Sequence, residues 1–285
     1  MPLSMEDNFA WQNALQKFRG TVFGLESANV VGYQSNDLTS GEYNTGVATF
    51  LQVGKEKTTQ TLGAIALKNA ASMGSVLMLV APDGSTPYIQ HDELGEVSAM
   101  FWYVTEADYQ DVGASAPGWY LQDDGGFEYP MNDYVIPYGT GFLIDCSDDA
   151  AQIVYSGEVL KGAQSIALAS GEYNMTGNAT PQEQKMGDFV LNNAASMGSV
   201  VMLVAADGST PYIEHPELGE VSAMFWYVTE ADYQDVGASV PGWYLQDDGG
   251  FEYPMNDYPI PAGMGFLIDC SDDDAQLVMP SVLAK

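Results

Sequence analysis

The chain contains a long, nearly exact duplication. Residues 69–154 begin NAASMGSVLMLVAPDGSTPYI and residues 193–278 begin NAASMGSVVMLVAADGSTPYI, and 76 of the 86 aligned positions are identical at an offset of 124 without a gap. SGEYN occurs at 40–44 and again at 170–174, an offset of 130, so the first copy carries six extra residues near VGKEKTTQT. Because both copies keep the same apolar residues, we expect two homologous units, each with its own hydrophobic core.

The duplication sets the domain boundaries. Of the 285 residues, 1–28 precede the repeat, 29–157 form the first unit and 158–285 form the second. Each unit has an ordinary domain length and needs no disulfide to bury a core. Two copies of one surface in a single chain are typical of binding and assembly proteins.

The N-terminal segment, 1–28, is expected to hold a short helix. Apolar side chains recur at roughly helical spacing over Asn8–Phe18, with Asp7 or Asn8 as its cap. The helix either packs onto the first unit or, with Lys17 and Arg19, forms an arm that docks on a neighbouring acidic subunit. The segment lacks the basic and apolar regions of a secretory signal, so either the protein is not exported or the sequence is a mature or truncated form. We expect an extracellular or cell-surface protein.

Short apolar runs alternate with turn signals along both units, which predicts an all-β protein. The expected fold is two tandem β-sandwich domains of jelly-roll-like form. Pro-Asp-Gly and Asp-Asp-Gly-Gly steps between the runs supply the positive φ that tight hairpins need. Elsewhere we expect only short helices, which begin at the two TEADY segments, 105–109 and 229–233. The expected strands include Val76–Val80, Met100–Val104, Gly118–Leu121 and Gly141–Asp145.

Two glycine-rich motifs carry a family resemblance. SGEYNMTGNATP at 170–181 and IPAGMGFLIDC at 260–270 resemble the GxNxxGNxxP … PxGxGF pattern of β-sandwich modules in secreted and surface proteins of Bacteroidetes and related bacteria. The first unit keeps the second motif, VIPYGTGFLID at 135–145, but SGEYNTGVATF at 40–50 lacks the GNxxP part. The resemblance implies a non-catalytic module and assigns no functional residue.

The charge balance excludes several functions. Asp and Glu number 39 against 8 Lys and Arg, a formal net charge of −31, which argues against binding nucleic acid or anionic membrane surfaces. No run of 18 apolar residues exists, so no membrane insertion is expected. No cation lies between Lys68 and Lys161 or between Lys185 and Lys285, so salt bridges there are expected to be nearly absent. The carboxylates must be solvated, bonded to backbone amides, bound to metal or recognised by a cationic partner.

Calcium is the candidate cofactor. The QDDGGFE loop occurs twice, and its acidic side chains could supply several oxygens to one hard cation, although its spacing is not that of an EF-hand. A hairpin turn with exposed acids is the slightly favoured alternative. The candidate ligands are Asp123, Asp124 and Glu128 in the first unit and Asp247, Asp248 and Glu252 in the second.

No catalytic constellation is apparent, and we expect no enzyme. His91 and His215 are equivalent across the repeat and lie in separate units, which disfavours a zinc site. Cys146 and Cys270 are likewise equivalent, so they are expected as buried free thiols unless symmetry brings the two together. A pair of carboxylates for glycoside hydrolysis is an alternative that rests only on the abundance of Asp and Glu.

Adjacent aromatic residues give the main binding signal. In a half-buried strand, one side chain of each adjacent pair points away from the core. Such rings could stack on sugars, bury in an interface, or simply lie under loops. The candidate ligand-binding residues are Trp102, Trp119, Tyr120, Trp226, Trp243 and Tyr244.

These features together predict a non-enzymatic structural or adhesive protein. We expect it to bind itself or other surface proteins, with equivalent units packing head to tail and continuing between molecules into a filament or array. The alternative is a carbohydrate-binding protein that takes polysaccharide on the aromatic platform with help from calcium.

Overall fold

The structure is a computed structural model that describes residues 31–41, 43–52, 59–123, 126–147, 151–160, 162–171, 173–194, 197–205, 207–247, 250–271 and 275–279. The segment 1–28, with its predicted helix, lies outside these residues. Val31–Lys285 forms one compact unit. The all-β prediction is confirmed: among the described residues the helical elements are two short 3-10 turns, η1 (Leu62–Ala64) and η2 (Met186–Asp188).

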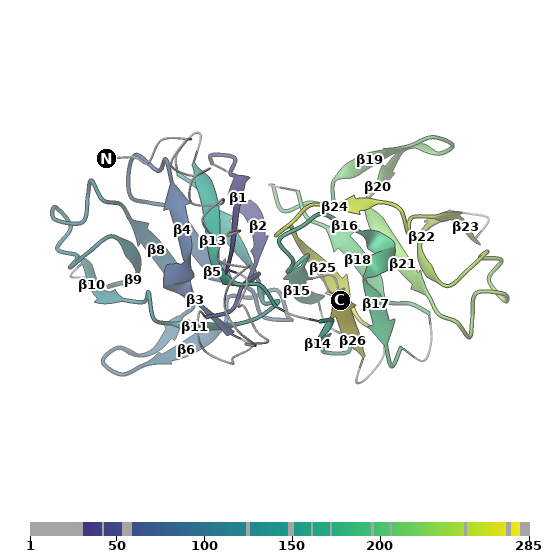
Figure 1. Cartoon of the computed structure of the whole chain (residues 1–285), viewed down its shortest axis with the longest axis horizontal. Helices are drawn as coiled ribbons and strands as arrows, with labels where there is room; N and C mark the ends of the chain where they lie inside the picture. Colours follow the sequence, from purple (N-terminus) through teal and green to yellow (C-terminus); the bar gives the residue numbers. More distant parts are fainter. Residues whose placement is uncertain are drawn as a thin grey trace, which may run out of the picture. The chain divides into compact units, whose positions relative to one another are not determined.

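The first repeat contributes three sheets and a separate hairpin (Figure 1). Its six-stranded sheet has the order β10-β9-β8-β5-β12-β2, its three-stranded sheet the order β1-β13-β4, and β11 pairs with β3. The strands are β1 (Val31–Asp37), β2 (Tyr43–Val47), β3 (Thr59–Thr61), β4 (Ile65–Lys68), β5 (Val76–Leu79), β6 (Tyr88–His91), β7 (Gly95–Ser98), β8 (Met100–Val104), β9 (Gly118–Asp123), β10 (Gly126–Pro130), β11 (Val135–Pro137), β12 (Gly141–Asp145) and β13 (Gln152–Glu158).

The second repeat has the same sheets in the same strand order. Its six-stranded sheet is β15-β25-β18-β21-β22-β23, its three-stranded sheet is β14-β26-β17, and β16 pairs with β24. The strands are β14 (Gln164–Ala167), β15 (Tyr173–Gly177), β16 (Gln184–Lys185), β17 (Val190–Asn192), β18 (Val200–Leu203), β19 (Tyr212–His215), β20 (Gly219–Ser222), β21 (Met224–Val228), β22 (Gly242–Asp247), β23 (Gly250–Pro254), β24 (Pro259–Ile260), β25 (Gly265–Asp269) and β26 (Gln276–Met279).

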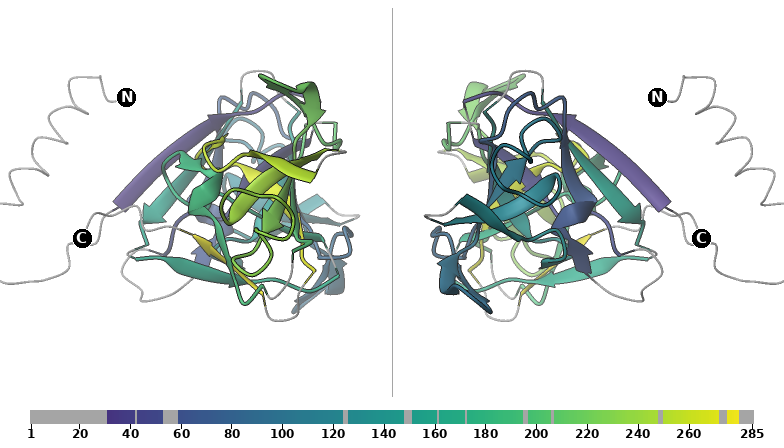
Figure 2. Two further views of the ribbon diagram at one scale, coloured as in Figure 1. Left: turned by 90° about the vertical axis from the view of Figure 1, so that its right-hand side faces the viewer. Right: turned by 90° about the vertical axis from the view of Figure 1, so that its left-hand side faces the viewer.

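The duplicated sequence therefore folds twice in the same way. Every described sheet takes its strands from a single repeat. The four apolar runs named from the sequence form β5, β8, β9 and β12, all in the six-stranded sheet. Figure 2 views the ribbons from both ends, with the green to yellow strands of the second repeat foremost in its left panel. The sheet pairings alone do not confirm the finer prediction of two β-sandwiches.

The prediction that the TEADY segments start helices is wrong. Residues 106–113 form successive turns, with short backbone bonds such as Tyr109 N to Thr105 O at 3.1 Å. Asp108 Oδ2 accepts both the Thr105 hydroxyl and the Met73 N–H, at 2.6 and 2.9 Å. These side-chain bonds tie the turn to a distant loop, and Gly113 then adopts φ of 77° and ends the run.

The two repeats meet through equivalent surfaces, with β2 and β12 against β15 and β25. A Cβ at Gly141 would lie 2.6 Å from Met175 Cγ, and a Cβ at Gly265 would lie 3.0 Å from Thr45 Cβ. Gly265 is the counterpart of Gly141, and Thr45 is the counterpart of Met175. Such reciprocal contacts define an isologous, closed interface. Packing of the two repeats within one chain is therefore not head to tail.

Candidate functional site

Four of the six predicted ligand-binding aromatics belong to the core. Trp119, Tyr120, Trp243 and Tyr244 are at most 1% exposed, and the indole N–H of Trp119 donates to the Ile65 carbonyl. The expectation that one member of each adjacent pair points away from the core is wrong for these two pairs. The sheet is covered on both sides, because Tyr120 packs in a second apolar cluster with Val104, Ala114 and Phe127, beneath the turn segment after β8. These four rings form no platform for a sugar.

Trp102 and Trp226 are the two predicted aromatics that keep partial exposure. Each packs on the rim of the second apolar cluster of its repeat, and Trp102 meets Phe127 edge-on with ring centroids 6.5 Å apart. In the second repeat, Trp226 packs against the cluster that contains Phe251. These two rings are what remains of the predicted platform.

The predicted calcium ligands cannot be placed. Asp124 and Asp248 lie outside the described residues, as do the side chains of Asp123, Glu128, Asp247 and Glu252. Among the described residues, no group of three or more His, Cys, Asp or Glu side chains could hold a metal ion. Calcium therefore stays a prediction.

Cys146 and Cys270 are buried and form no disulfide with each other, as expected. Each thiol lies 3.9 Å from a serine hydroxyl, Ser75 or Ser199, at the end of a core strand. Both pack as small core residues.

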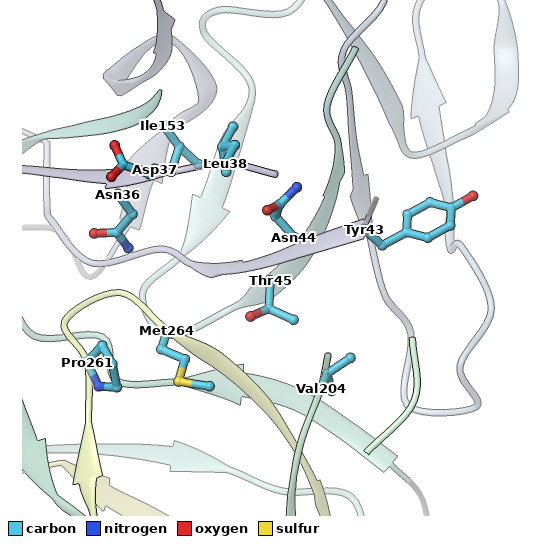
Figure 3. Close-up of a pocket in the computed structure, with 10 residues that line it drawn as sticks. All are labelled: Asn36, Asp37, Leu38, Tyr43, Asn44, Thr45, Ile153, Val204, Pro261 and Met264. Carbon is cyan, nitrogen blue, oxygen red and sulfur yellow. The ribbon is translucent and has the colours of Figure 1, made fainter. Parts of the chain in front are cut away.

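A groove of about 290 Å³ runs along the contact between the repeats (Figure 3). Asn36 Nδ2 donates to the Ala262 carbonyl at 3.0 Å across this contact. In Figure 3 the Tyr43 ring points away from Met264 and Thr45. The lining residues are Asn36, Asp37, Leu38, Tyr43, Asn44, Thr45, Ile153, Val204, Pro261 and Met264, which supply one carboxylate and no pair of nucleophile and base.

The counterpart groove on the other side of the contact has a volume of about 270 Å³. Ile166 and Met175 line it where the first groove has Asn36 and Thr45. The hydroxyl of Tyr138 donates to the Ala179 carbonyl at 2.5 Å, and its burial raises the pKa of Tyr138. The two grooves thus keep equivalent residues, such as Asn44 and Asn174, and differ in several of the side chains around them.

The hairpins β6–β7 and β19–β20 carry the most exposed large apolar side chains of the described residues. Tyr88 is 68% exposed and Tyr212 is 67% exposed, at equivalent positions. Each hairpin is a two-stranded sheet, and no third strand pairs with it in the described part of the chain. Its inner face, with Ile213 and Val221 in the second repeat, packs against the core, while Tyr212 faces outward with polar neighbours.

The outward faces of the two hairpins are acidic as well as aromatic. Gln90 pairs across the strands with Glu96, and in the second repeat Glu214 pairs with Glu220. Sequence reasoning missed Tyr88 and Tyr212 as candidates. The available signal was the YIQH and YIEH alternation, which places tyrosine on the polar face of a strand.

The cation-poor windows contain little ion pairing. Among the described residues one salt bridge occurs, Lys185 Nζ to Asp257 Oδ1 at 2.6 Å, and it shows that a lysine at the edge of a window can still reach into it. Other acids are held by local bonds: the Ser85 hydroxyl, and then its N–H, lower the pKa of Asp83. The same turn recurs at Asp207 and Ser209.

No helix among the described residues is long and apolar enough to cross a membrane. Comparison with known proteins adds no family: no family model, curated protein or solved structure matches this chain.

Proposed function

We propose that this is a non-enzymatic structural protein that self-associates outside the cell or at its surface, with the two hairpins as its contact sites. The observation that carries the proposal is the pair of matched, exposed tyrosines, Tyr88 and Tyr212, on hairpins that pack on the rest of the protein through one face. An exposed aromatic with a polar rim is typical of a protein-binding site.

We infer that each repeat is a β-sandwich, with its three-stranded sheet covering its six-stranded sheet. In the first repeat the ring of Tyr155 on β13 lies 6.3 Å, between centroids, from that of Phe142 on β12. A Cβ at Gly46 on β2 would lie 2.7 Å from the Tyr155 hydroxyl. These contacts join the two sheets directly, as expected of the inner faces of a sandwich.

The occupant we propose for the hairpins is residues 8–24 of a second copy. This stretch holds Lys17 and Arg19, two of the chain's eight cations, together with Phe9, Trp11, Phe18 and Phe23, and contains no Asp or Glu. The hairpin faces offer the complementary pair of properties, an exposed tyrosine beside carboxylates. Opposite charges and apolar rings on the two partners favour this contact over a contact between two acidic hairpins.

The geometry allows this contact to propagate. The interface between the repeats is closed and involves neither hairpin. Each chain therefore offers one arm, residues 8–24, and two hairpins for contacts with other molecules. An arm that binds a hairpin of another copy is a heterologous contact, which continues into an open chain of molecules. The second hairpin permits branching into an array.

The test uses two full-length double variants, Tyr88→Ser with Tyr212→Ser, and Lys17→Glu with Arg19→Glu. We expect sedimentation of the unchanged protein to show concentration-dependent association and each variant to sediment as a monomer. A mixture of the two should recover complexes of one hairpin-bearing chain with one or two arm-bearing chains, because one variant supplies arms and the other supplies two hairpins.

The matched control is Tyr33→Ser, which removes a 57% exposed tyrosine from β1 and should leave association unchanged. Either single hairpin variant should still associate, without branching. Association of the double hairpin variant at the level of the unchanged protein would overturn the proposal, provided its circular dichroism shows the same β content.

The second candidate function is binding of polysaccharide by Trp102 and Trp226. Their partial exposure at equivalent positions favours it, because one ring in each repeat could stack on a sugar. Retention on a polysaccharide column that is lost in Trp102→Ala with Trp226→Ala, and kept in the hairpin variants, would support this function over self-association. A melting temperature unchanged by calcium or by a chelator would remove calcium from both candidates.

A further inference from the structure

The turn of each hairpin is closed by the ring of a histidine. His91 Nδ1 accepts the backbone N–H groups of Glu93 and Leu94, both at 3.3 Å. His215 Nδ1 accepts those of Glu217 and Leu218 at 3.3 and 3.4 Å. These are the two histidines of the chain, and they make equivalent hydrogen bonds at equivalent positions of the two repeats.

The bonds require a ring nitrogen that carries no proton. A neutral imidazole has one acceptor nitrogen, whereas the imidazolium ion has none. A proton on His91 Nδ1 would therefore face two N–H donors, and both bonds of the turn would be lost. In water a histidine ring gains this proton at about pH 6.5.

Several acidic residues lie close to His91 in the turn and on the paired strand. Asp92 and Glu93 lie in the turn and Glu96 lies on β7, opposite Gln90. On β10, the ring of Tyr129 meets the imidazole edge-on, with centroids 5.1 Å apart; Glu128 precedes it in sequence. Around His215 the corresponding groups are Glu214, Glu217, Glu220 and Tyr253.

We infer that the two hairpin tips form a paired acid-sensitive switch, in which protonation of His91 and His215 opens the turns. The inference about the tips stands on their hydrogen bonds, and its consequence for assembly rests on the proposed function. Tyr88 and Tyr212 lie at the start of the strands that these turns join, whereas Glu96 and Glu220 lie close to the turns. Opening therefore disorders the part of the outward face next to the turn, which includes the carboxylates that bind the arm. Association should then weaken as the pH falls from 8 to 5.

The experiment measures amide hydrogen exchange by NMR in the full chain between pH 8 and pH 5. The control variant, His91→Asn with His215→Asn, keeps a side-chain carbonyl that can accept the N–H two residues on and takes up no proton in this range. We expect protection factors at Glu93, Leu94, Glu217 and Leu218 to fall about tenfold in the unchanged protein and to stay level in the variant. The amides of Ala99 and Ala223, bonded to the Pro87 and Pro211 carbonyls at 2.8 Å, should stay protected in both.

Unchanged tip protection in the natural chain, or an equal fall in the asparagine variant, would overturn the switch. Sedimentation of the same samples separates the two proposals. Tips that open while association persists would support the switch and reject the hairpins as assembly sites. Association that weakens in the unchanged protein but not in the asparagine variant supports both.

Discussion

The two repeats are nearly identical in their cores and hairpins but differ where they touch each other. Of the ten positions that differ among the 86 aligned, Pro82, Tyr138 and Thr140 line the groove between the repeats. Upstream, Asn36 and Thr45 of the first repeat face the contact where the second has Ile166 and Met175. A closed interface between two copies thus became two unlike grooves, one bridged by Asn36 and one filled by Tyr138.

The difference shows which parts of the fold act within a repeat and which act between repeats. Core side chains away from the contact between the repeats, such as Trp119 and Trp243, are buried in the same way in both copies. A side chain at the shared contact meets the other repeat, so a change on one side alters only one of the two grooves. The hairpins are not part of the contact between the repeats, and both keep the tyrosine at the same position.

The largest expected effect tests whether the two cores are equivalent. Trp119→Ala and Trp243→Ala should each destabilise the protein by about 3–5 kcal/mol, because each deletes a fully buried ring. Each indole also donates to a buried carbonyl, of Ile65 or Phe189. Urea denaturation should give losses that match within about 0.5 kcal/mol, as for independent sites in equal surroundings. A clear inequality would show that the cores differ.

The second prediction concerns a network found in the second repeat. Asn178 is fully buried, and its Nδ2 donates to the carbonyls of Gln182, Ile260 and Pro261 at 2.8 to 3.1 Å. Asn178→Ala should cost about 3 kcal/mol, because several buried polar groups lose their partner. Denaturation of the variant measures this loss. The first repeat has Ala48 at this position, so a loss below about 1 kcal/mol would mean that the network adds little.

The third prediction sharpens the asymmetry of the contact. A Cβ at Gly141 would lie 2.7 Å from the Met175 backbone carbon and 2.8 Å from Thr176 N, whereas at Gly265 the nearest atoms are 3.0 Å away. Gly141→Ala should therefore cost about 1–3 kcal/mol, and Gly265→Ala clearly less. Thermal melts of both variants decide this, and the reverse order would contradict the contact geometry.

The fourth prediction uses alkaline pH. Burial raises the pKa of Tyr138 above that of an unfolded tyrosine, so the neutral hydroxyl contributes stability below about pH 10 that is lost as the pH rises further. Tyr138→Phe should cost about 1 kcal/mol at pH 7, from the bond to the Ala179 carbonyl, and should lose less stability than the unchanged protein above pH 10. Parallel alkaline melts test the sign.

The smallest expected effect distinguishes the two hairpin tips. The first tip has Asp92 where the second has Pro216, and proline restricts the unfolded chain at a position that the second tip already accommodates. Asp92→Pro should stabilise the first tip by about 0.4–1 kcal/mol, seen as slower exchange of the Glu93 and Leu94 amides. Faster exchange would show that the two turns differ in backbone conformation.

Several features of the fold could be predicted from local sequence. Runs such as Met100–Val104 gave the strands, and the change of offset from 130 to 124 located the insertion between β2 and β3. The prediction of helix at the TEADY segments was wrong because Asp108 accepts a hydrogen bond from the distant Met73 N–H. Tyr120 was predicted to bind a ligand because a strand pattern does not reveal that a turn segment covers the second face of its sheet.

The sequence by itself determined the all-β class, the duplication and the charge of −31. These follow from composition and from short-range periodicity, which act over a few residues. The tertiary structure alone decided that Trp119 is buried while Tyr88 is exposed, and that the repeats meet through reciprocal surfaces. Burial and symmetry depend on which segments far apart in the chain are brought together, and local sequence patterns do not specify these long-range contacts.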